Sequence, residues 1–337
     1  MPASHEQDAP PYAELTPETV LEAVEVLGGR ASGTLLALNS YENRVYQVGL
    51  DDGDFLVAKF YRPGRWSDDQ ILEEHAFSLE LAEHEIPVVA PLADSKGRRL
   101  FVHGGYRYAL FPRRGGRAPE LDDPEHLRWL GRFIGRIHAV GAVRAFQHRP
   151  TLDLASFGHA SLRYLTEHGF VPSELAHNFT LAAEQVLERV EAGFDAAGPV
   201  RRLRLHGDCH PGNILWTERG PHFVDLDDAR MGPAVQDLWM LLSGSAEEMG
   251  LQMRSVMEGY REFYDFDPIE LRLIEPLRAL RILHYSAWLA RRWHDPAFPQ
   301  HFPWFNTPRY WEEQLNTLRE LTERLDDPGC EISMRAL

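Results

Sequence analysis

Residues 203–216 read LRLHGDCHPGNILW, and residues 224–229 read VDLDDA. The first stretch has the form H-x-D-x-x-x-x-N, which places Asp208 and Asn213 on one loop. A hairpin between the two stretches would bring Asn213 beside Asp225. Phosphoryl transfer from ATP needs a carboxylate that orients the incoming hydroxyl and accepts its proton. It also needs oxygen ligands that hold Mg²⁺ against the phosphates. The two motifs together fit that chemistry, with ATP as donor and Mg²⁺ as cofactor.

The chain around these motifs is expected to be mostly helical. An island of short strands and loops within a helical region is a usual place for chemistry, because loops on a rigid scaffold carry most functional groups. The Pro- and aromatic-rich stretch 295–310 is expected to be an ordered loop. Apolar residues at helical spacing predict helices over 124–140, 153–167, 173–196, 233–265, 268–292 and 307–326.

The first 112 residues follow a different pattern. Thr16-Pro17-Glu18 is typical of a helix start, and Gly28-Gly29 of a helix end. From Thr34 the period changes to two, and a further helix is predicted over 68–84. The segments predicted as strands are TLLALNS, NRVYQVGL, FLVAKFY, RRLFVH and YRYALFP. This part of the chain should form a small antiparallel sheet with one inserted helix.

A change of composition separates the two parts. The segment RRGGRAPELDDP is rich in Gly, Pro and charge, which is typical of a linker. We therefore predict an N-terminal lobe over 1–112 that binds nucleotide on its sheet, a hinge over 113–123, and a helical C-terminal lobe over 124–337 with the catalytic and metal-binding loops. The fold class is α+β.

Composition excludes several classes of function. The chain has 337 residues, with 35 Lys and Arg against 51 Asp and Glu, a net charge of −16. This balance disfavours broad nucleic-acid binding, which depends on neutralising phosphates. No stretch approaches the roughly 18 uninterrupted apolar residues that a membrane helix needs. Two cysteines, Cys209 and Cys330, cannot build a disulfide framework, and no export signal is visible. We expect a cytoplasmic protein and, in the absence of heptad repeats, a monomer.

The two motifs also resemble a known group of proteins. HGDCHPGNIL followed by VDLDDA is similar to the aminoglycoside-phosphotransferase and choline-kinase group of protein-kinase-like proteins. NSYENRVYQ, VAKFYRP, ILEEHAF and PAFPQHFPW extend the resemblance from about Leu15 to Trp311, and they are similar to bacterial stress-response kinases within that group. The resemblance implies a two-lobed protein-kinase-like fold with ATP between the lobes. It also implies a Ser or Thr acceptor on a protein, in a cytoplasmic stress response.

The resemblance implies roles for residues of the two motifs. Asp208 stands where the group has its catalytic base. Asn213 and Asp225 stand at its Mg²⁺ ligands, so that Asp225 belongs to both the catalytic and the metal-binding set. Asp237 resembles the helix aspartate that braces the catalytic loop.

The resemblance also implies a nucleotide site in the N-terminal part. Lys59, in VAKFY, matches the strand lysine that grips the α and β phosphates. Glu74 would pair with that lysine, with Glu73 as the alternative. Ser40 matches a position that contacts ATP, and Phe111 and its neighbours should form the hinge that binds adenine.

The sequence departs from protein kinases in two places. LNSYEN (38–43) stands where G-x-G-x-x-G would cover the phosphates. The loop must therefore bind phosphate through other backbone N–H groups or the Ser40 hydroxyl. The D-F-G and A-P-E motifs are missing, so activation-loop phosphorylation is not expected to be the switch.

Other interpretations of single residues stay open. His206, Asp208 and His210 have the spacing of metal ligands, although a metallohydrolase would need further His and Asp clusters. Cys209 is either a redox switch or an inert buried thiol. Asp227 and Asp228 either add a metal ligand or form hydrogen bonds within their loop.

Two further groups of residues have alternative interpretations. The arginines either face an acidic or phosphorylated substrate or form a solvated surface. The aromatic residues either line a substrate cleft or pack a Pro-rich loop onto helices. The arginines are Arg278, Arg281, Arg291 and Arg292, and the aromatic residues are Trp293, Phe298, Phe302, Trp304 and Phe305.

The chemistry of the motifs serves any alcohol as acceptor. A small-molecule kinase for an amino sugar, a choline-like alcohol or homoserine is therefore one alternative function. A catalytically weak ATP-binding regulator is another, suggested by the missing glycine loop.

Overall fold

The computed structural model describes residues 10–326, which form two compact units that are discontinuous in sequence. The first unit comprises the described residues up to Leu79 together with Val89–Arg114 and Arg292–Pro303. The second comprises Glu80–Val88, Gly115–Arg291 and the described residues from Trp304 onward. The lobe boundaries at 113–123 stay a prediction.

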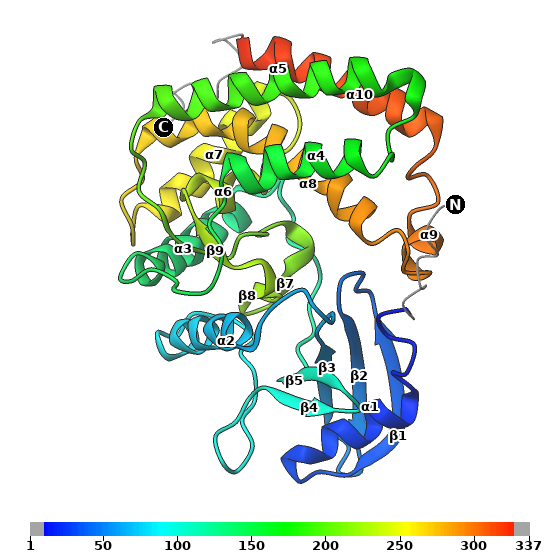
Figure 1. The fold of residues 1–337 in the computed structure, drawn as a ribbon. Coiled ribbons are helices and arrows are strands. Elements are labelled where there is room, and N and C mark those ends of the chain that lie inside the picture. The colour runs from blue at the N-terminus through cyan, green and yellow to red at the C-terminus, as the bar shows by residue number, and fades with distance from the viewer. Residues whose placement is uncertain (1–9, 327–337) are drawn as a thin grey trace, which may run out of the picture. The chain divides into compact units, whose positions relative to one another are not determined.

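The first unit is built on a five-stranded antiparallel sheet, which confirms the predicted sheet (Figure 1). The strand order is β1-β2-β3-β5-β4, so that β3 lies at the centre of the sheet. All five predicted strands are present. Their bounds are β1 Ala31–Leu38, β2 Arg44–Leu50, β3 Phe55–Phe60, β4 Phe101–His103 and β5 Tyr106–Pro112.

A short helix covers this sheet. Helix α1 (Pro17–Val24) begins at Thr16, whose side chain accepts a hydrogen bond from the N–H of Thr19, and continues as a 3-10 turn over Glu25–Leu27. The Tyr108 hydroxyl of β5 donates to the carbonyl of Ala23 at 2.8 Å. The core beneath the helix consists of Val20, Ala23, Val24, Val48, Ala58, Phe60, Phe101, Tyr106, Tyr108 and Leu110.

The inserted helix also forms as predicted. Helix α2 spans Asp68–Glu83, one residue short of the predicted end. Its apolar residues Ile71, Phe77 and Leu81 are buried. Two polar residues of the same helix, Glu74 and His75, are buried as well, which an amphipathic surface helix does not require.

The second unit is largely helical, and its helices agree with most of the predicted spans. A 3-10 segment, η5 (Pro268–Leu273), precedes α8. The helices are α3 Pro124–Gly141, α4 Ala160–Glu167, α5 Ser173–Ala197, α6 Val235–Trp239, α7 Ala246–Tyr260, α8 Ile274–Arg291 and α10 Pro308–Asp326. No helix among residues 10–326 is long and apolar enough to cross a membrane.

The prediction of one helix over 233–265 was wrong. The chain forms α6, turns, and then begins α7. Gly244, in the turn between the two helices, has φ +96°, a left-handed conformation that favours glycine. Ser245 then caps α7 in a reciprocal pair with Glu248. The sequence Gly-Ser-x-x-Glu at 244–248 is the local signal for this turn and for the start of α7.

The stretch 295–310 was expected to be a loop, and this too was partly wrong. It contains the short helix α9 (Ala297–His301), and α10 begins at Pro308. Pro296 is the N-cap of α9 and Pro308 is the first residue of α10, positions where a missing N–H costs nothing.

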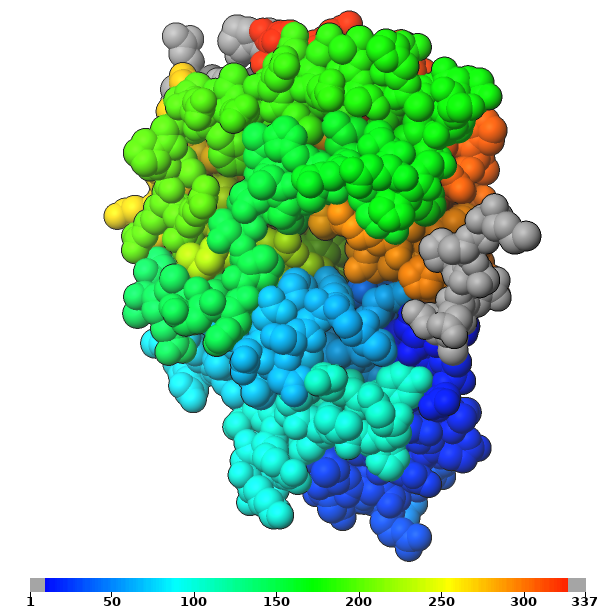
Figure 2. Space-filling view, in the orientation of Figure 1, coloured from blue at the N-terminus to red at the C-terminus, as the bar shows by residue number. Residues whose placement is uncertain are grey.

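Aromatic packing joins α5 to α10 in the second unit. The Trp311 ring of α10 is fully buried and meets the Phe179 ring of α5 edge-on at 5.5 Å between centroids. The two helices run alongside each other in Figure 1, and α5, in green, forms the surface of this end of the unit in Figure 2.

Candidate active site

The loop that carries the HGDCHPGN motif lies in the second unit, directly after a buried strand. Strand β6 (Leu203–Leu205) pairs antiparallel with β9 (Arg230–Gly232). The loop then closes in a 3-10 turn over Pro211–Asn213. Strand β6 therefore fixes where the loop begins, and the 3-10 turn fixes where it ends.

One carboxylate holds the start of this loop. Asp237 Oδ2 accepts a hydrogen bond from the N–H of His206 at 2.8 Å, and Oδ1 accepts from the N–H of Gly207 at 2.9 Å. Asp237 is 1% exposed. His138 Nε2 donates to the same carboxylate at 3.2 Å, and the Tyr260 hydroxyl lies 2.7 Å from His138 Nδ1. The brace expected at Asp237 is thus present as a buried network.

The second residue of the motif requires glycine. Gly207 has φ +85°, and a Cβ there would lie 2.2 Å from the carbonyl oxygen of Asp228. Any side chain would therefore push apart the two loops that carry the motif residues.

Arg281 and His210 both contact Asp208. Arg281 Nη1 of α8 donates to Asp208 Oδ1 at 2.8 Å, and His210 Nε2 lies 3.5 Å from Oδ2. Burial raises the pKa of the Asp208 carboxyl, but the His210 hydrogen bond and the Arg281 charge outweigh burial and hold it below its ordinary value. The carboxylate is therefore ionised and able to accept a proton.

The hairpin between the two motifs is present. Strands β7 (Ile214–Thr217) and β8 (Gly220–Phe223) pair antiparallel, with Ile214 opposite Phe223. The N–H of Val224 then donates to the carbonyl of Asn213 at 3.0 Å, which places Asn213 next to Asp225.

The donor set of Asn213 and Asp225 fits a hard cation. Asn213 Nδ2 donates to the carbonyl of Asp208 at 3.0 Å, so its amide oxygen points away from that bond. Asp225 has φ +60°, a left-handed conformation that is uncommon outside glycine and frequent at functional sites. One carboxylate and one amide oxygen suit Mg²⁺, which commonly takes few protein ligands and keeps water or phosphate oxygens.

The neighbouring carboxylates have other contacts. Asp228 Oδ1 accepts from Arg230 Nη2 at 2.5 Å. Asp227 is buried, and its carbonyl accepts from Arg149, which also donates through Nε to the carbonyl of Ala229 at 2.8 Å. Arg149 thus ties down the backbone of the second motif.

The motif histidines also use ring nitrogens in hydrogen bonds to the backbone. His206 Nε2 donates to the carbonyl of Val224 at 2.9 Å, and His210 Nδ1 accepts from the N–H of Gly212 at 3.0 Å. Within the described part of the chain, no group of three or more His, Cys, Asp or Glu side chains is placed to hold a metal ion.

Cys209 is buried, and burial raises the pKa of its thiol well above the ordinary value. A protonated, enclosed thiol is unreactive, which favours the interpretation as an inert residue over a redox switch. Cys330 lies outside the described residues.

Three of the residues predicted to bind nucleotide gather around Tyr61 in the first unit. Lys59 of β3 is buried, and its Nζ lies 5.4 Å from the centre of the Tyr61 ring. The Tyr61 hydroxyl lies 2.7 Å from His75 Nε2, and the same nitrogen lies 3.8 Å from Glu74 Oε2. The Phe111 ring meets His75 edge-on.

Ser40 lies in the turn between β1 and β2. Its hydroxyl donates to the carbonyl of Asn43 at 3.1 Å, closing the turn within the segment LNSYEN. The predicted contact of Ser40 with ATP stays a prediction.

Sequence reasoning missed several buried polar residues that support the site. His138, Arg149 and Tyr260 hold the loops that carry the two motifs. Tyr61 lies beside Lys59, and His75 contacts the Tyr61 hydroxyl. The partners of these residues are distant in the sequence, so neither a motif nor a periodic pattern predicts the contacts. Arg281 was noted only as one of a run of arginines.

A buried acid supports helix α6, which carries Asp237. Glu270 Oε2 accepts from the N–H of Val235 at 2.9 Å, and the side chain is 3% exposed. Burial raises the pKa of Glu270 to about 7, against a smaller opposing effect of that hydrogen bond.

The chain resembles known phosphotransferases over most of its length. The sequence model of the phosphotransferase enzyme family matches residues 34–274. Stress response kinase A of Salmonella choleraesuis (strain SC-B67) is 47% identical over 322 residues, covering 96% of this chain and 97% of the relative. Serine/threonine protein kinase RdoA of Salmonella typhimurium is 46% identical over 322 residues, which cover 96% of this chain and 97% of that relative.

A solved structure shows the same fold. Amicoumacin kinase hAmiN, in complex with AMP-PNP, Ca²⁺ and Ami, superimposes with a TM-score of 0.70 at 20% identity, covering 96% of each chain. The predicted protein-kinase-like fold is thereby confirmed.

We predict that Asp237→Asn destabilises the catalytic loop. An amide has one oxygen, so one of the two N–H donors loses its acceptor, and a buried donor without a partner costs about 1–3 kcal/mol. Thermal unfolding should show a lower Tm than wild type. An unchanged Tm would contradict the brace.

We predict that Glu270→Gln changes the pH dependence of stability. Because the folded-state pKa is raised from 4.5 to about 7, wild type loses stability as the pH rises through that interval. The amide cannot ionise, so the variant should match wild type near pH 4.5 and exceed it at pH 8, by up to about 3 kcal/mol. Urea unfolding at both pH values measures this. Parallel pH profiles of the two proteins would contradict it.

Proposed function

This chain belongs to the phosphotransferase enzyme family, and on that premise we propose that it transfers the γ-phosphoryl group of ATP to a serine or threonine hydroxyl of a protein. Mg²⁺ is the proposed cofactor.

The observation that carries this proposal is the geometry of the loop 206–213. Asp208 and Asn213 lie on one loop that Asp237 braces, and the β7–β8 hairpin puts Asp225 beside Asn213. A base and two oxygen ligands within one short segment are what phosphoryl transfer to an alcohol requires.

Asp208 is the proposed base. Its carboxylate orients the acceptor hydroxyl and takes its proton as the oxygen attacks the γ-phosphorus, and the phosphorus–oxygen bond to ADP breaks. Arg281 and His210 keep the carboxylate ionised before the acceptor arrives. Arg281 is 41% exposed, so a polar acceptor can compete for it.

Asn213 and Asp225 are the proposed ligands of Mg²⁺. When bound, the ion would neutralise charge on the phosphate oxygens. Asn213 is held by its bonds to Asp208 and Val224, so its amide oxygen has a fixed direction.

Lys59 and Ser40 are proposed to bind the phosphates of ATP. Lys59 is buried beside the Tyr61 ring, with Glu74 nearby in the same cluster, which keeps its long side chain ordered. Phe111 is the proposed hinge residue for adenine. A solved structure with the same fold was crystallised with AMP-PNP, which supports a nucleotide as donor.

A protein acceptor is proposed from the relatives. The name of the relative from Salmonella typhimurium describes a serine/threonine protein kinase, and the relative from Salmonella choleraesuis is named as a stress response kinase. We carry both to this chain as a proposal, with the cytoplasm, which supplies ATP, as its location.

Asp208→Asn should lower phosphoryl transfer by at least ~10², the scale of a positioned base, with folding intact. The assay follows label from [γ-³²P]ATP into the chain itself and into a generic protein substrate. Asp326→Asn is the matched control, because Asp326 also pairs with an arginine, Arg189, at 2.9 Å but lies on α10 outside the proposed site.

The label also separates the alternatives. Label on Ser or Thr that disappears in Asp208→Asn supports a protein kinase. ATP binding without protein labelling would favour a small-molecule kinase or a regulator. Wild-type turnover in Asp208→Asn would contradict the assignment of Asp208 as the base.

Asp225→Asn should abolish the gain in AMP-PNP affinity that Mg²⁺ provides, because the neutral amide is a weaker ligand for a hard cation. Calorimetry with Mg²⁺ and with EDTA measures this gain for the variant and for Asp326→Asn. Equal Mg²⁺ dependence in both variants would count against Asp225 as a ligand.

A further inference from the structure

The segment 292–303 belongs to the first unit, although it follows the helices of the second. It contains α9 and contacts the turn that joins β1 to β2. We call this turn, residues 39–43, the phosphate loop, in line with the proposed function.

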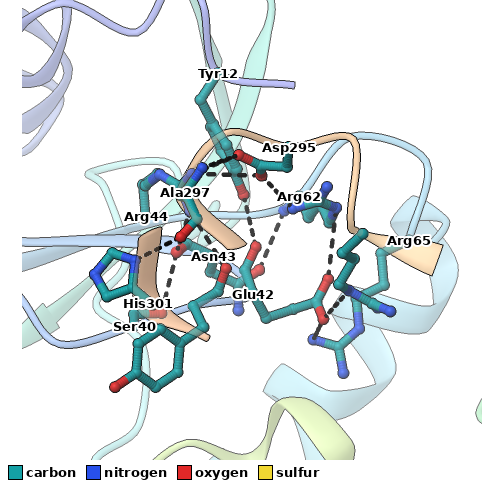
Figure 3. A network of polar contacts seen from close by, with 12 residues as sticks. Tyr12, Ser40, Glu42, Asn43, Arg44, Arg62, Arg65, Asp295, Ala297 and His301 are labelled. Carbon is teal, nitrogen blue, oxygen red and sulfur yellow. Dashed lines mark hydrogen bonds and ion pairs between the residues drawn. The ribbon is translucent and has the colours of Figure 1, made fainter. Parts of the chain in front are cut away.

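Glu42 of the phosphate loop is held by the segment 292–303. Arg292 Nε lies 2.6 Å from Glu42 Oε2, and the two side chains are only 14% and 11% exposed. Arg62 and Arg65, which follow β3, each lie 3.8 Å from the same carboxylate. Figure 3 shows the two guanidinium groups facing Glu42. A largely buried carboxylate among three guanidinium groups has little freedom to move.

Asp295 makes a second anchor on the same segment. It accepts from Arg62 Nη1 at 2.9 Å and from Arg44 Nη2 at 3.5 Å, and it is 2% exposed (Figure 3). The N–H of Arg62 in turn donates to Asn43 Oδ1 at 3.1 Å. Asp295 therefore contacts Arg44, the first residue of β2, directly. It is linked to the phosphate loop through Arg62, which binds Asn43.

Aromatic contacts make a third anchor. The Tyr41 ring meets His301 and Phe302 edge-on, with centroids 5.2 and 4.8 Å apart. His301 Nδ1 lies 2.7 Å from the carbonyl of Ala297, which fixes the ring to α9.

These contacts supply an order that the phosphate loop does not gain from its own sequence. The phosphate loop has no glycine, so it cannot fold closely over phosphates by backbone freedom alone. A loop held in advance in its binding conformation loses less entropy when the ligand binds. Three of its five residues, Tyr41, Glu42 and Asn43, are held from outside by these contacts.

We propose that the segment 292–303 positions the phosphate loop for Mg·ATP, with Arg292 and Asp295 as its positioning residues. This inference rests on the proposed function, since it requires that the loop bind nucleotide. Neither residue need touch ATP: each acts through the loop residues that it holds.

The test compares Arg292→Met and Glu42→Gln with wild type. Calorimetry with Mg·AMP-PNP should show a Kd raised about 10-fold in each variant, within the usual range of coupling between linked sites. The double variant should lose no more affinity than Glu42→Gln alone, because Arg292→Met removes a pair that Glu42→Gln already breaks. Arg292→Lys keeps the charge and should recover part of the affinity.

Hydrogen exchange separates a positioning role from a purely structural one. Exchange of the amides in 39–43 should accelerate in Arg292→Met, whereas exchange in β3 should stay as in wild type. The matched control is Arg98→Met, which removes an ion pair with Asp94 at 2.9 Å in the same unit, away from the phosphate loop. It should leave the Kd within twofold of wild type. If Arg292→Met fails to fold, Glu42→Gln carries the test.

Each outcome is decisive. Folded Arg292→Met and Glu42→Gln with wild-type Kd would overturn the positioning role and leave the proposed function standing. An equal loss in Arg98→Met would also overturn it, because the effect would then be general destabilisation. Failure of wild type itself to bind Mg·AMP-PNP would overturn the proposed function, and the positioning role with it.

Discussion

Two backbone N–H groups that share one buried carboxylate hold the proposed active site. Asp237 accepts from the N–H of His206 through one carboxyl oxygen and from the N–H of Gly207 through the other, and its side chain is buried. His138 adds a third hydrogen bond to the same buried side chain. With the start of the loop fixed, Asp208 and Asn213 follow at set positions, and the β7–β8 hairpin brings Asp225 to them. The chemistry that we propose depends on this arrangement.

Much of the fold could be predicted because its signals are local. Alternation of apolar residues gave all five strands of the first sheet, and Thr16-Pro17 and the apolar stripe of α2 gave its two helices. The single helix predicted over 233–265 failed because apolar periodicity resumes after the break. Only Gly244 and the cap at Ser245 mark the turn. The short helix α9 was not predicted because a stretch rich in Pro and aromatic residues is more typical of a loop.

Only part of the candidate site could be predicted from the sequence. Asp208, Asn213 and Asp225 could be proposed from two motifs, because the chemistry requires those residue types close together in sequence. The groups that hold them could not, because Arg281, Arg149 and His138 come from distant helices and loops. Contacts of Glu42 with Arg292, 250 positions away, are of the same kind. A motif identifies the groups that react, whereas the fold supplies the groups that position them.

The most direct test of the central claim is a crystal structure with Mg²⁺ and AMP-PNP. The account predicts the metal on the Asn213 amide oxygen and the Asp225 carboxylate, with the γ-phosphate facing Asp208 and Lys59 on the α and β phosphates. A nucleotide bound elsewhere, or a metal that touches neither Asn213 nor Asp225, would contradict it.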